Sequence, residues 1–424
     1  MIIHVVNQGE TINSIAAQYG VSAERLITDN GIENVNRLVV GQALVVLIPE
    51  TTHTVAAGET IQGIAAQYGI DEINLLQNNP ALINNRTLNA GEVLVISYEG
   101  EKLREGRFNG YAYPFINMET LRTALTYMTL LTIFGYGFTE TGELIPIDDE
   151  VLIREAYAFR ASPMMLISSI DEEGNFSNEH AEKLFGDPVA RETLITNIIN
   201  TMYIKGYVGL DIDFEFIRSR ENYITFIEAV TTRLHAEGFI VNVDLAPKTS
   251  ADQPGLIYQA HDYARIGEIA DTVLLMTYEW GYLYGPPMAV APLDQVRRVV
   301  EYAITEIDVN KIMLGIPNYA YDWKLPYVRG ESEAVIIGNT EAIDIAARYN
   351  AVIEFDTTAM TPFFYYFDEA GVQHVVWFED ARSIEAKLRL IQEYNLLGGG
   401  YWNLMRKFQA NWSVLNSLYI IDKL

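Results

Sequence analysis

Three acidic residues alternate with apolar ones in the segment 209–215: Asp211, Asp213 and Glu215. Successive side chains of a β-strand point to opposite faces, so a strand here gathers the three carboxylates on one face. Carboxylates buried together repel one another and lose hydration, which raises the pKa of at least one of them. Three readings are open: an acid catalyst, a site for a hard metal cation, or an edge strand whose acids face water.

The surrounding sequence favours the acid catalyst. Leu210, Ile212 and Phe214 make the opposite face apolar, which argues against an exposed edge strand. No His and no further Asp/Glu cluster at ligand spacing stands nearby, and the six His residues form no spacing pattern. We therefore expect no metal, no cofactor and no His-based triad.

Composition narrows the choice of partners. The 424 residues include 56 acidic and 29 basic ones, a formal net charge of −27, and no cysteine. This charge argues against nucleic acid or an anionic bilayer, whereas a neutral or mixed-charge ligand such as a glycan fits it. The lack of cysteine excludes disulfides, thiolate metal sites and a Cys nucleophile. No apolar run reaches the length of a membrane span, and residues 1–6 do not begin an export signal, so neither is expected.

The acids need a scaffold, and the pattern from residue 108 onward provides one. Apolar strand-like runs alternate with helical periodicity at 191–205, 221–237, 293–306 and 383–393. The eight strands are expected at 108–113, 130–138, 164–169, 208–215, 240–245, 272–278, 311–317 and 399–402. They predict an α/β fold, a (β/α)8 TIM barrel, with Glu215 at the carboxyl end of strand four, where catalytic residues of such barrels lie. The interval 324–380 predicts an α+β insertion between strands seven and eight, walling one side of the cleft.

Residues 1–98 contain an internal duplication, in which His4 of the first copy recurs as His53. Each copy reads as a strand, a Gly-Glu-Thr helix start, a helix ending at Tyr-Gly, a second helix ending near Asn, and a closing strand. These features predict two small βααβ domains at 1–49 and 52–98. Residues 99–107 are read as a polar linker to the barrel domain, 108–424.

Each copy resembles the LysM module, which binds glycans containing N-acetylglucosamine, such as peptidoglycan and chitin. The resemblance implies a groove between the strand-to-helix loop and the loop that follows helix two. These loops are 9–12 with 30–32 in the first copy and 58–61 with 79–82 in the second. The implied glycan-binding residues are Gly9, Thr11, Asn30, Gly58, Thr60 and Asn79.

The region from residue 108 to the end resembles glycoside hydrolase family 18. Its signature Asp-x-x-Asp-x-Asp-x-Glu is matched at the last three acids, while Val208 occupies the first place. Further matches are Met276-Thr277-Tyr278-Glu279 on strand six, with Glu for the family's Asp, Leu314-Gly315-Ile316-Pro317-x-Tyr319 on strand seven, and Gly400-Tyr401-Trp402 on strand eight. Val208 leaves the tuning of the acid open.

The family implies hydrolysis in which the substrate's own acetamido oxygen attacks the anomeric carbon. On this resemblance Glu215 protonates the glycosidic oxygen, Asp213 orients the acetamido group, and Asp211 shares a proton with Asp213. Tyr278 donates a hydrogen bond to the acetamido oxygen. The implied substrate-binding residues are Trp402, Tyr319, Trp280 and Glu279; for the aromatic residues, core packing is the alternative.

Two LysM-like copies before a family 18-like barrel resemble the spore cortex-lytic enzymes of endospore formers. Segments 246–250, 285–289 and 376–383 support the comparison. It implies an N-acetylglucosaminidase that acts on cortex peptidoglycan or its fragments, located in the spore cortex or coat layer, and we expect a monomer. Alternatives are a chitinase of the same fold and a non-catalytic glycan-binding protein of the coat or cell wall. Polymer, endo or exo action and fragment length stay open.

Overall fold

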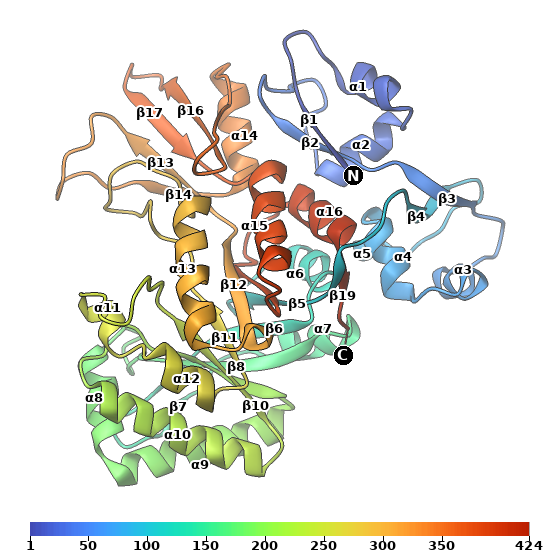
Figure 1. The fold of residues 1–424 in the computed structure, drawn as a ribbon. Coiled ribbons are helices and arrows are strands. Elements are labelled where there is room, and N and C mark those ends of the chain that lie inside the picture. Colours follow the sequence, from blue (N-terminus) through green and yellow to red (C-terminus); the bar gives the residue numbers. More distant parts are fainter. Residues whose placement is uncertain (424) are drawn as a thin grey trace.

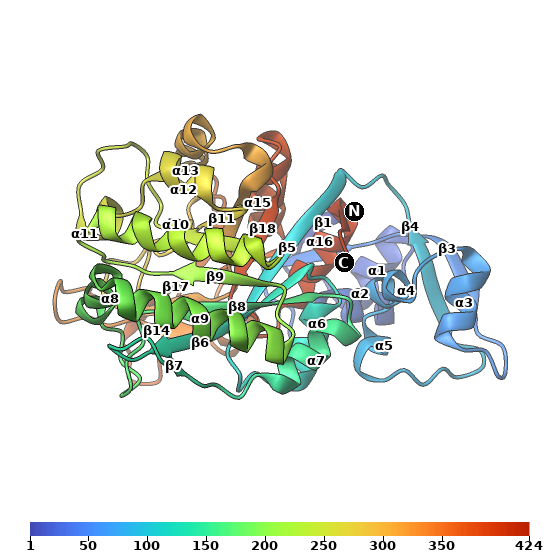
Figure 2. The same cartoon turned by 90° about the horizontal axis from the view of Figure 1, so that it is seen from below.

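The computed structural model describes residues 1–423, in which two small modules pack on one side of a large barrel (Figures 1 and 2). Each module pairs its first strand antiparallel with its last. Threonine caps begin the first helix of both: Thr11 accepts from the Ser14 N–H, and Thr60 from the Gly63 N–H. The βααβ pattern is confirmed, with one extra short helix in the second module. The elements are β1 (Ile2–Val5), α1 (Ile12–Tyr19), α2 (Ala23–Asn30) and β2 (Ala43–Val46), then β3 (Pro49–Thr54), α3 (Ile61–Tyr68), α4 (Glu72–Asn78), α5 (Ala81–Asn84) and β4 (Val93–Tyr98).

Eight parallel strands close into the predicted TIM barrel. They are β5 (Arg104–Ala112), β6 (Leu130–Phe138), β8 (Ser162–Ser168), β9 (Gly209–Asp213), β10 (Ile240–Leu245), β11 (Thr272–Leu275), β12 (Ile312–Pro317) and β18 (Gly398–Trp402). Their order is β5-β18-β12-β11-β10-β9-β8-β6, and a β5–β6 pairing closes the ring. Two short strands extend the sheet: β7 (Leu144–Ile145) along β6 and β19 (Tyr419–Ile421) along β5.

Helices cover the outside of the barrel, and Figure 2 shows several of them along one flank. In α10, Tyr223, Ile227 and Val230 are buried at helical spacing, which turns one stripe of this helix to the sheet. The helices are α6 (Met118–Leu125), α7 (Glu150–Ala158), α8 (Asn178–Gly186), α9 (Pro188–Lys205), α10 (Arg220–Ala236), α11 (Leu256–Gln259), α12 (Tyr263–Ile269), α13 (Leu293–Glu306), the short 3-10 helix η1 (Val309–Lys311), α15 (Ala381–Glu393) and α16 (Gln409–Leu418).

Several predicted boundaries differ from the structure. Strand four ends at Asp213 rather than at residue 215, and strand six ends at Leu275 rather than at 278. In both, the chain leaves the hydrogen-bonded ladder where it turns toward the mouth of the barrel. Residues 104–107 of the predicted linker belong to β5, because Arg104 pairs with Tyr419, a partner too distant in sequence to be read locally.

The insertion between strands seven and eight forms its own antiparallel sheet, in the order β14-β13-β17-β16-β15. This sheet begins at Ala320, ahead of the predicted start at residue 324, because Tyr321 already pairs with Trp377. The elements are β13 (Ala320–Lys324), β14 (Val335–Ile337), α14 (Asn339–Arg348), β15 (Glu354–Asp356), β16 (Thr361–Phe367) and β17 (Gln373–Trp377).

The first module packs directly against this insertion. The Ile353 N–H donates to the carbonyl of Val40 at 2.9 Å, and Val39 is buried in the same apolar cluster as Ile337. Gly41 has a φ of 88°, and a Cβ there would lie 2.0 Å from the Ile353 carbonyl oxygen. Only glycine fits so close to the Ile353 carbonyl, so Gly41 is what allows the module to pack against the insertion.

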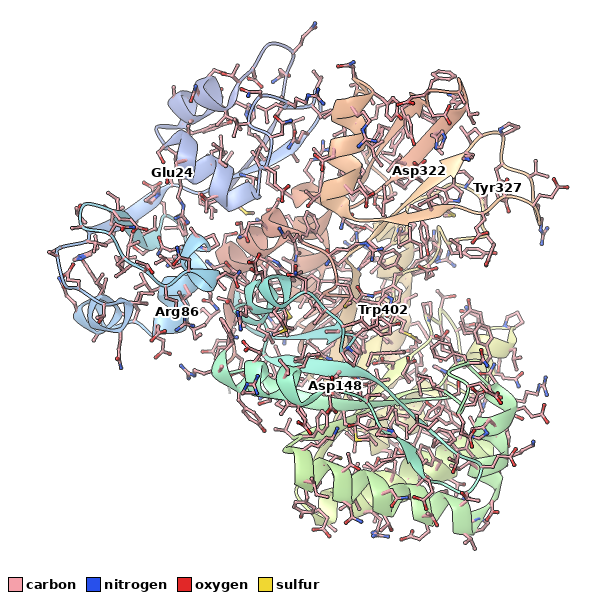
Figure 3. All side chains as sticks on the ribbon, turned by 180° about the vertical axis from the view of Figure 1, so that it is seen from behind. Glu24, Arg86, Asp148, Asp322, Tyr327 and Trp402 are labelled. Carbon is pink, nitrogen blue, oxygen red and sulfur yellow. The ribbon has the colours of Figure 1, made fainter. Side chains whose placement is uncertain are left out.

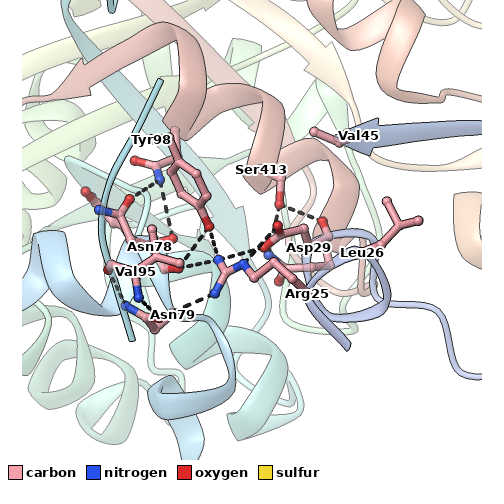
Figure 4. A network of polar contacts seen from close by, with 12 residues as sticks. Arg25, Leu26, Asp29, Val45, Asn78, Asn79, Val95, Tyr98 and Ser413 are labelled. Atoms are coloured by element: carbon pink, nitrogen blue, oxygen red, sulfur yellow. Dashed lines mark hydrogen bonds and ion pairs between the residues drawn. The ribbon is translucent and has the colours of Figure 1, made fainter. Parts of the chain in front are cut away.

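Arg25 joins the two modules (Figure 4). Its guanidinium donates to Asp29 at 3.0 Å and to the Asn79 side chain at 3.4 Å, and it also reaches the Asn78 carbonyl and the Tyr98 hydroxyl. Burial raises the pKa of Asp29 to about 6, although Arg25 opposes the shift. The Arg25 guanidinium therefore contacts both modules, and it pairs with Asp29, a carboxylate that is almost entirely shielded from water.

Replacing Arg25 by alanine is expected to lower the free energy of unfolding by about 3 kcal/mol, because breaking a buried ion pair leaves one charge uncompensated. Urea unfolding at pH 7.5 measures the change. Asp29→Asn added to this variant removes the orphan charge and is expected to recover part of the loss. Unchanged stability in Arg25→Ala contradicts the assignment.

The same pair gives a pH dependence with a defined sign. The folded pKa of Asp29, about 6, lies above its unfolded value near 4. The folded state therefore binds more protons between these values, and the contribution of Asp29 to stability decreases as pH rises from about 4 to 6.

Candidate active site

The predicted acids lie at the carboxyl end of β9. Asp211 and Asp213 belong to the strand and share one face, whereas Glu215 follows two residues after the strand ends. Phe216 has a φ of 58°, in the left-handed region, so the chain turns sharply directly after Glu215. Strand alternation therefore aligns the first two acids, and a turn presents the third.

His261 fixes this turn. Its Nδ1 accepts from the Ala246 N–H at 2.8 Å, so its Nε2 carries the proton and donates to the Phe214 carbonyl at 3.1 Å. Burial lowers the pKa of His261 to about 4, which keeps the ring neutral. The peptide that precedes Glu215 is thereby held by a side chain from the loop between α11 and α12, which is itself anchored to the residue after β10. This role could not be predicted from the sequence, since no spacing connects His261 with the acids.

Asp211 lies deepest and is fully buried. Its two oxygens accept from Asn242 Nδ2 at 2.7 Å and Thr132 Oγ1 at 3.1 Å. Burial raises the pKa of Asp211, and these hydrogen bonds act in the opposite direction. Val208, at the first signature place, precedes β9, and neighbouring strands supply the polar partners of Asp211 instead.

A fourth carboxylate, Asp244 on β10, was missed in the sequence. It is 3% exposed and accepts from the Tyr111 hydroxyl at 2.8 Å and from Asn242 at 3.0 Å. Burial raises the pKa of Asp244, and the charges of Asp211 and Asp213 raise it further. The signal was present, because Asn242 and Asp244 alternate with apolar residues as the acids of β9 do.

Asp213 differs from Asp211 in that one of its carboxylate oxygens has no protein partner in the described part of the chain. Its Oδ1 is buried and has no hydrogen-bond partner within residues 1–423. Burial raises the pKa of Asp213 well above its usual range, and the charges of Glu215 and Asp211 add to the shift. An oxygen in this state can accept a hydrogen bond from a substrate amide.

Glu215 is half-buried, and its pKa is raised, first by burial and then by the charge of Glu279. A carboxyl group with a raised pKa keeps its proton toward neutral pH, as a general acid requires. Glu279 has a φ of 66°, and its carboxylate accepts hydrogen bonds from the hydroxyls of Tyr319 and Tyr321. Tyr319 is only 5% exposed, so it positions the Glu279 carboxylate from the protein interior.

Glu279→Gln is expected to move the alkaline limb of the kcat/KM–pH profile to lower pH. The charge of Glu279 raises the pKa of Glu215, so its removal lets Glu215 lose its proton earlier. Tyr321→Phe, which keeps the carboxylate, is the matched control and should leave the limb near its wild-type position. A limb that stays in place in Glu279→Gln would argue that other groups set the pKa of the acid.

Tyr278 faces the same carboxylates. Burial and the charges of Asp244, Asp213 and Glu215 raise its pKa well above the usual range. The phenol therefore keeps its proton and can donate a hydrogen bond.

A pocket of about 480 Å³ contains Asp213, Glu215 and Trp402, with Phe134 and Phe176 among its aromatic walls. Trp402 packs edge-on against Phe134 at 5.3 Å between ring centroids, which leaves the indole half-exposed toward the pocket. Figure 3 shows Trp402 between the barrel and the insertion that carries Asp322 and Tyr327. Trp280 is half-buried against the main core and does not line this pocket.

The module residues implied as glycan ligands have structural partners. Asn30 donates to the carbonyl of Val45 at 2.8 Å and accepts from its N–H at 2.7 Å, and Asn79 repeats both bonds with Val95 at 2.8 and 2.9 Å. These asparagines therefore clasp the loop that follows helix two to the closing strand.

The other four candidates shape the first loop of each module. Thr11 and Thr60 cap helices, and Gly9 and Gly58 adopt φ of 86° and 88° in the preceding turn. Positive φ at these positions favours glycine over other residues.

Within residues 1–423, no group of three or more His, Cys, Asp or Glu side chains is arranged to hold a metal ion. None of the helices in this part of the chain combines the length and apolarity needed to cross a membrane.

The barrel, the carboxylates and the aromatic pocket define a glycoside hydrolase. The model for glycosyl hydrolases family 18 matches residues 158–406, and the LysM domain model matches 4–47 and 53–97. The chain belongs to glycosyl hydrolases family 18, with LysM domains at its N-terminal side. Both resemblances seen in the sequence are thereby confirmed.

Similarity to individual proteins extends over the whole chain. It is 41% identical to the cortical fragment-lytic enzyme of Bacillus subtilis (strain 168), covering 100% of this chain and 99% of the relative. The crystal structure of the Bacillus megaterium QM B1551 spore cortex-lytic enzyme SleL superposes with a TM-score of 0.83 at 38% identity, covering 100% of this chain and 99% of the other. For the Bacillus cereus spore cortex-lytic enzyme SleL the TM-score is 0.84 at 35% identity, with the same coverage.

Proposed function

We propose that this enzyme hydrolyses spore cortex peptidoglycan, or fragments of it, as an N-acetylglucosaminidase. The observation that carries the proposal is the row of buried acids ending at Glu215 beside the aromatic pocket, on a chain similar throughout to cortical fragment-lytic enzymes. It acts in the spore as a monomer, and its LysM domains hold the polymer.

Glu215 donates its proton to the glycosidic oxygen as the bond to the leaving sugar breaks. The unpartnered Oδ1 of Asp213 accepts from the acetamido N–H and turns the acetamido oxygen toward the anomeric carbon. The carboxylate then stabilises the positive charge of the oxazolinium intermediate. Glu215, now ionised, takes a proton from the incoming water, and two inversions give a retained anomeric configuration.

Neighbouring groups serve this step. Tyr278 donates to the acetamido oxygen, and Trp402 offers an aromatic face beneath the sugar ring. Asp211 and Asp244 exchange protons with Asp213 as its charge changes, because their raised pKa values keep part of the cluster protonated.

The LysM domains are proposed to bind N-acetylglucosamine units of the same polymer. Their grooves are formed by the loops that carry Gly9, Thr11, Asn30, Gly58, Thr60 and Asn79. Asn30 and Asn79 also hold these loops to the closing strands through the hydrogen bonds described above. Loss of either asparagine is therefore expected to weaken glycan binding by disordering its loop.

A chitinase activity is the second candidate, and one observation favours it. Asp213, Tyr278 and Trp402 recognise only the acetamido sugar, which chitin and peptidoglycan share. The active site alone therefore accepts either polymer.

Mass spectrometry of products tests both candidates. Wild-type protein and Glu215→Gln are incubated with cortex peptidoglycan, vegetative peptidoglycan and chitin oligomers. New reducing-end N-acetylglucosamine from cortex material, absent with the variant, is the expected result. Cleavage of chitin alone would replace the proposal by the second candidate, and binding without cleavage of any polymer would overturn both.

A further inference from the structure

A second cavity lies outside the active site, between the first module and the insertion. Its volume is about 270 Å³. It is lined by residues 30–34, 37 and 42–44 of the module, by α14 of the insertion, and by 378–381, 408 and 410. We call it the intermodule crevice. None of its residues lines the catalytic pocket.

The two walls of the intermodule crevice are fixed relative to each other. The Val40 carbonyl accepts from the Ile353 N–H at 2.9 Å, and Arg382 Nη2 donates to the Gly41 carbonyl at 3.2 Å. A Cβ on Gly31 would lie 2.8 Å from Cβ of Gln409, so this loop also touches α16 closely. The crevice is thus part of the packed structure.

Charges of both signs line the crevice. Arg37 and Arg348 are exposed and form no ion pair within residues 1–423, whereas Glu33 lies 3.7 Å from Lys407. Asp344, on α14, has a pKa raised by burial and by the charge of Glu33. The charge of Arg348 lowers the pKa of Asp344 in turn, so these two groups attract each other. The two guanidinium groups, which form no ion pair with the described residues, are therefore available to an anion, and Asp344 is available to a cation.

The first residue of α14, Asn339, provides a further hydrogen-bond donor that has no partner in the part of the chain that the structure describes. Asn339 is 1% exposed, and its Oδ1 accepts from the Glu379 N–H at 2.8 Å, but its Nδ2 has no hydrogen-bond partner within residues 1–423. Glu379 is occupied by its buried ion pair with Lys387 at 2.8 Å. A buried amide donor without a partner is unfavourable unless a ligand or water accepts from it.

We propose that the intermodule crevice binds the short peptide carried by peptidoglycan strands, with Arg37 and Arg348 pairing its carboxylates and Asp344 its ammonium group. This rests on the proposed function and names the part of the polymer that the chain recognises outside the catalytic pocket. Arginine matches carboxylates with paired hydrogen bonds. Chitin is uncharged and cannot form ion pairs with Arg37, Arg348 or Asp344, so the crevice would distinguish two polymers that the active site does not.

Calorimetric titration of Glu215→Gln, which binds without turnover, tests the crevice with two probes. One is a soluble peptide-bearing glycan fragment of peptidoglycan, and the other is the same fragment after an amidase has removed the peptides. Adding Arg37→Gln and Arg348→Gln together is expected to weaken binding of the first probe about five- to tenfold and leave the second unchanged. Arg154→Gln, an exposed change on α7 away from the crevice, is the matched control and should alter neither.

Equal losses for both probes, or no loss for either, overturn the proposal. The proposed function is scored separately by cleavage of cortex peptidoglycan with wild-type protein. If the wild type cleaves cortex peptidoglycan but the double variant shows no peptide-specific loss of binding, the crevice proposal is wrong and the proposed function stands. The peptide-specific loss without cleavage keeps the crevice and removes the function.

Discussion

Glu215→Gln is expected to lower kcat on cortex glycan by about 10²- to 10⁴-fold, the usual contribution of a general acid, with little change in KM. Glutamine has nearly the shape of the acid but cannot give a proton to the leaving oxygen. Burial and the charge of Glu279 raise the pKa of Glu215, which favours its protonated form in the wild type. Initial rates of reducing-end release over a range of substrate concentrations separate the two constants.

Glu173→Gln provides the matched control for this change. Glu173 is exposed in the turn after β8 and does not line the catalytic pocket, so its rate should equal that of the wild type. Turnover of Glu215→Gln within about threefold of the wild type would place the proton donor elsewhere.

Asp213→Asn has the second largest expected effect, a decrease in kcat of about 10²- to 10³-fold, the range seen when a group that stabilises developing charge is removed. The amide can still contact the acetamido group, but it lacks the negative charge that stabilises the oxazolinium. Since Oδ1 of Asp213 has no protein partner, the substitution breaks no hydrogen bond at that atom. Stability should therefore stay near the wild-type value while turnover falls.

Asp211→Asn separates charge from position in the same experiment. Asp211 has both oxygens engaged by Asn242 and Thr132 and acts through Asp213, so a smaller loss of kcat is expected. Single-turnover rates of both variants measure the difference. Equal losses would mean that the two acids work as one unit, and the separate role of Asp213 would be lost.

Local pattern predicted the barrel and part of its site. Alternation along one strand identified Asp211, Asp213 and Glu215, because the period of a strand is a property of neighbouring residues. Asp244 alternates with apolar residues on its own strand, but its closeness to Asp211 follows only once β10 lies beside β9. The contact of Tyr319 with Glu279 likewise follows only once β11 and β12, which they follow, lie side by side. Such pairings depend on contacts between distant segments, which strand periodicity does not encode.

The modules show the same division. Caps such as Thr11 follow from a few consecutive residues, and the sequence predicted the helices they begin. Arg25, in contrast, reads as an ordinary surface arginine of α2, and only the packing of both modules shows that Asp29, Asn79 and Tyr98 depend on it.

Gly41 lets the main chain of the first module approach the insertion closely enough for a hydrogen bond between Val40 and Ile353. The first module is therefore held in a fixed position relative to the catalytic pocket. A module on a flexible linker samples many positions, and linker length then sets the local concentration of substrate at the active site. Here, we expect a glycan strand bound by the module to present its bonds to Glu215 at a constant distance. The rigid contact between module and insertion would then set the distance between the bound unit and the cleaved bond. The glycan fragments released are therefore expected to cluster around one preferred length.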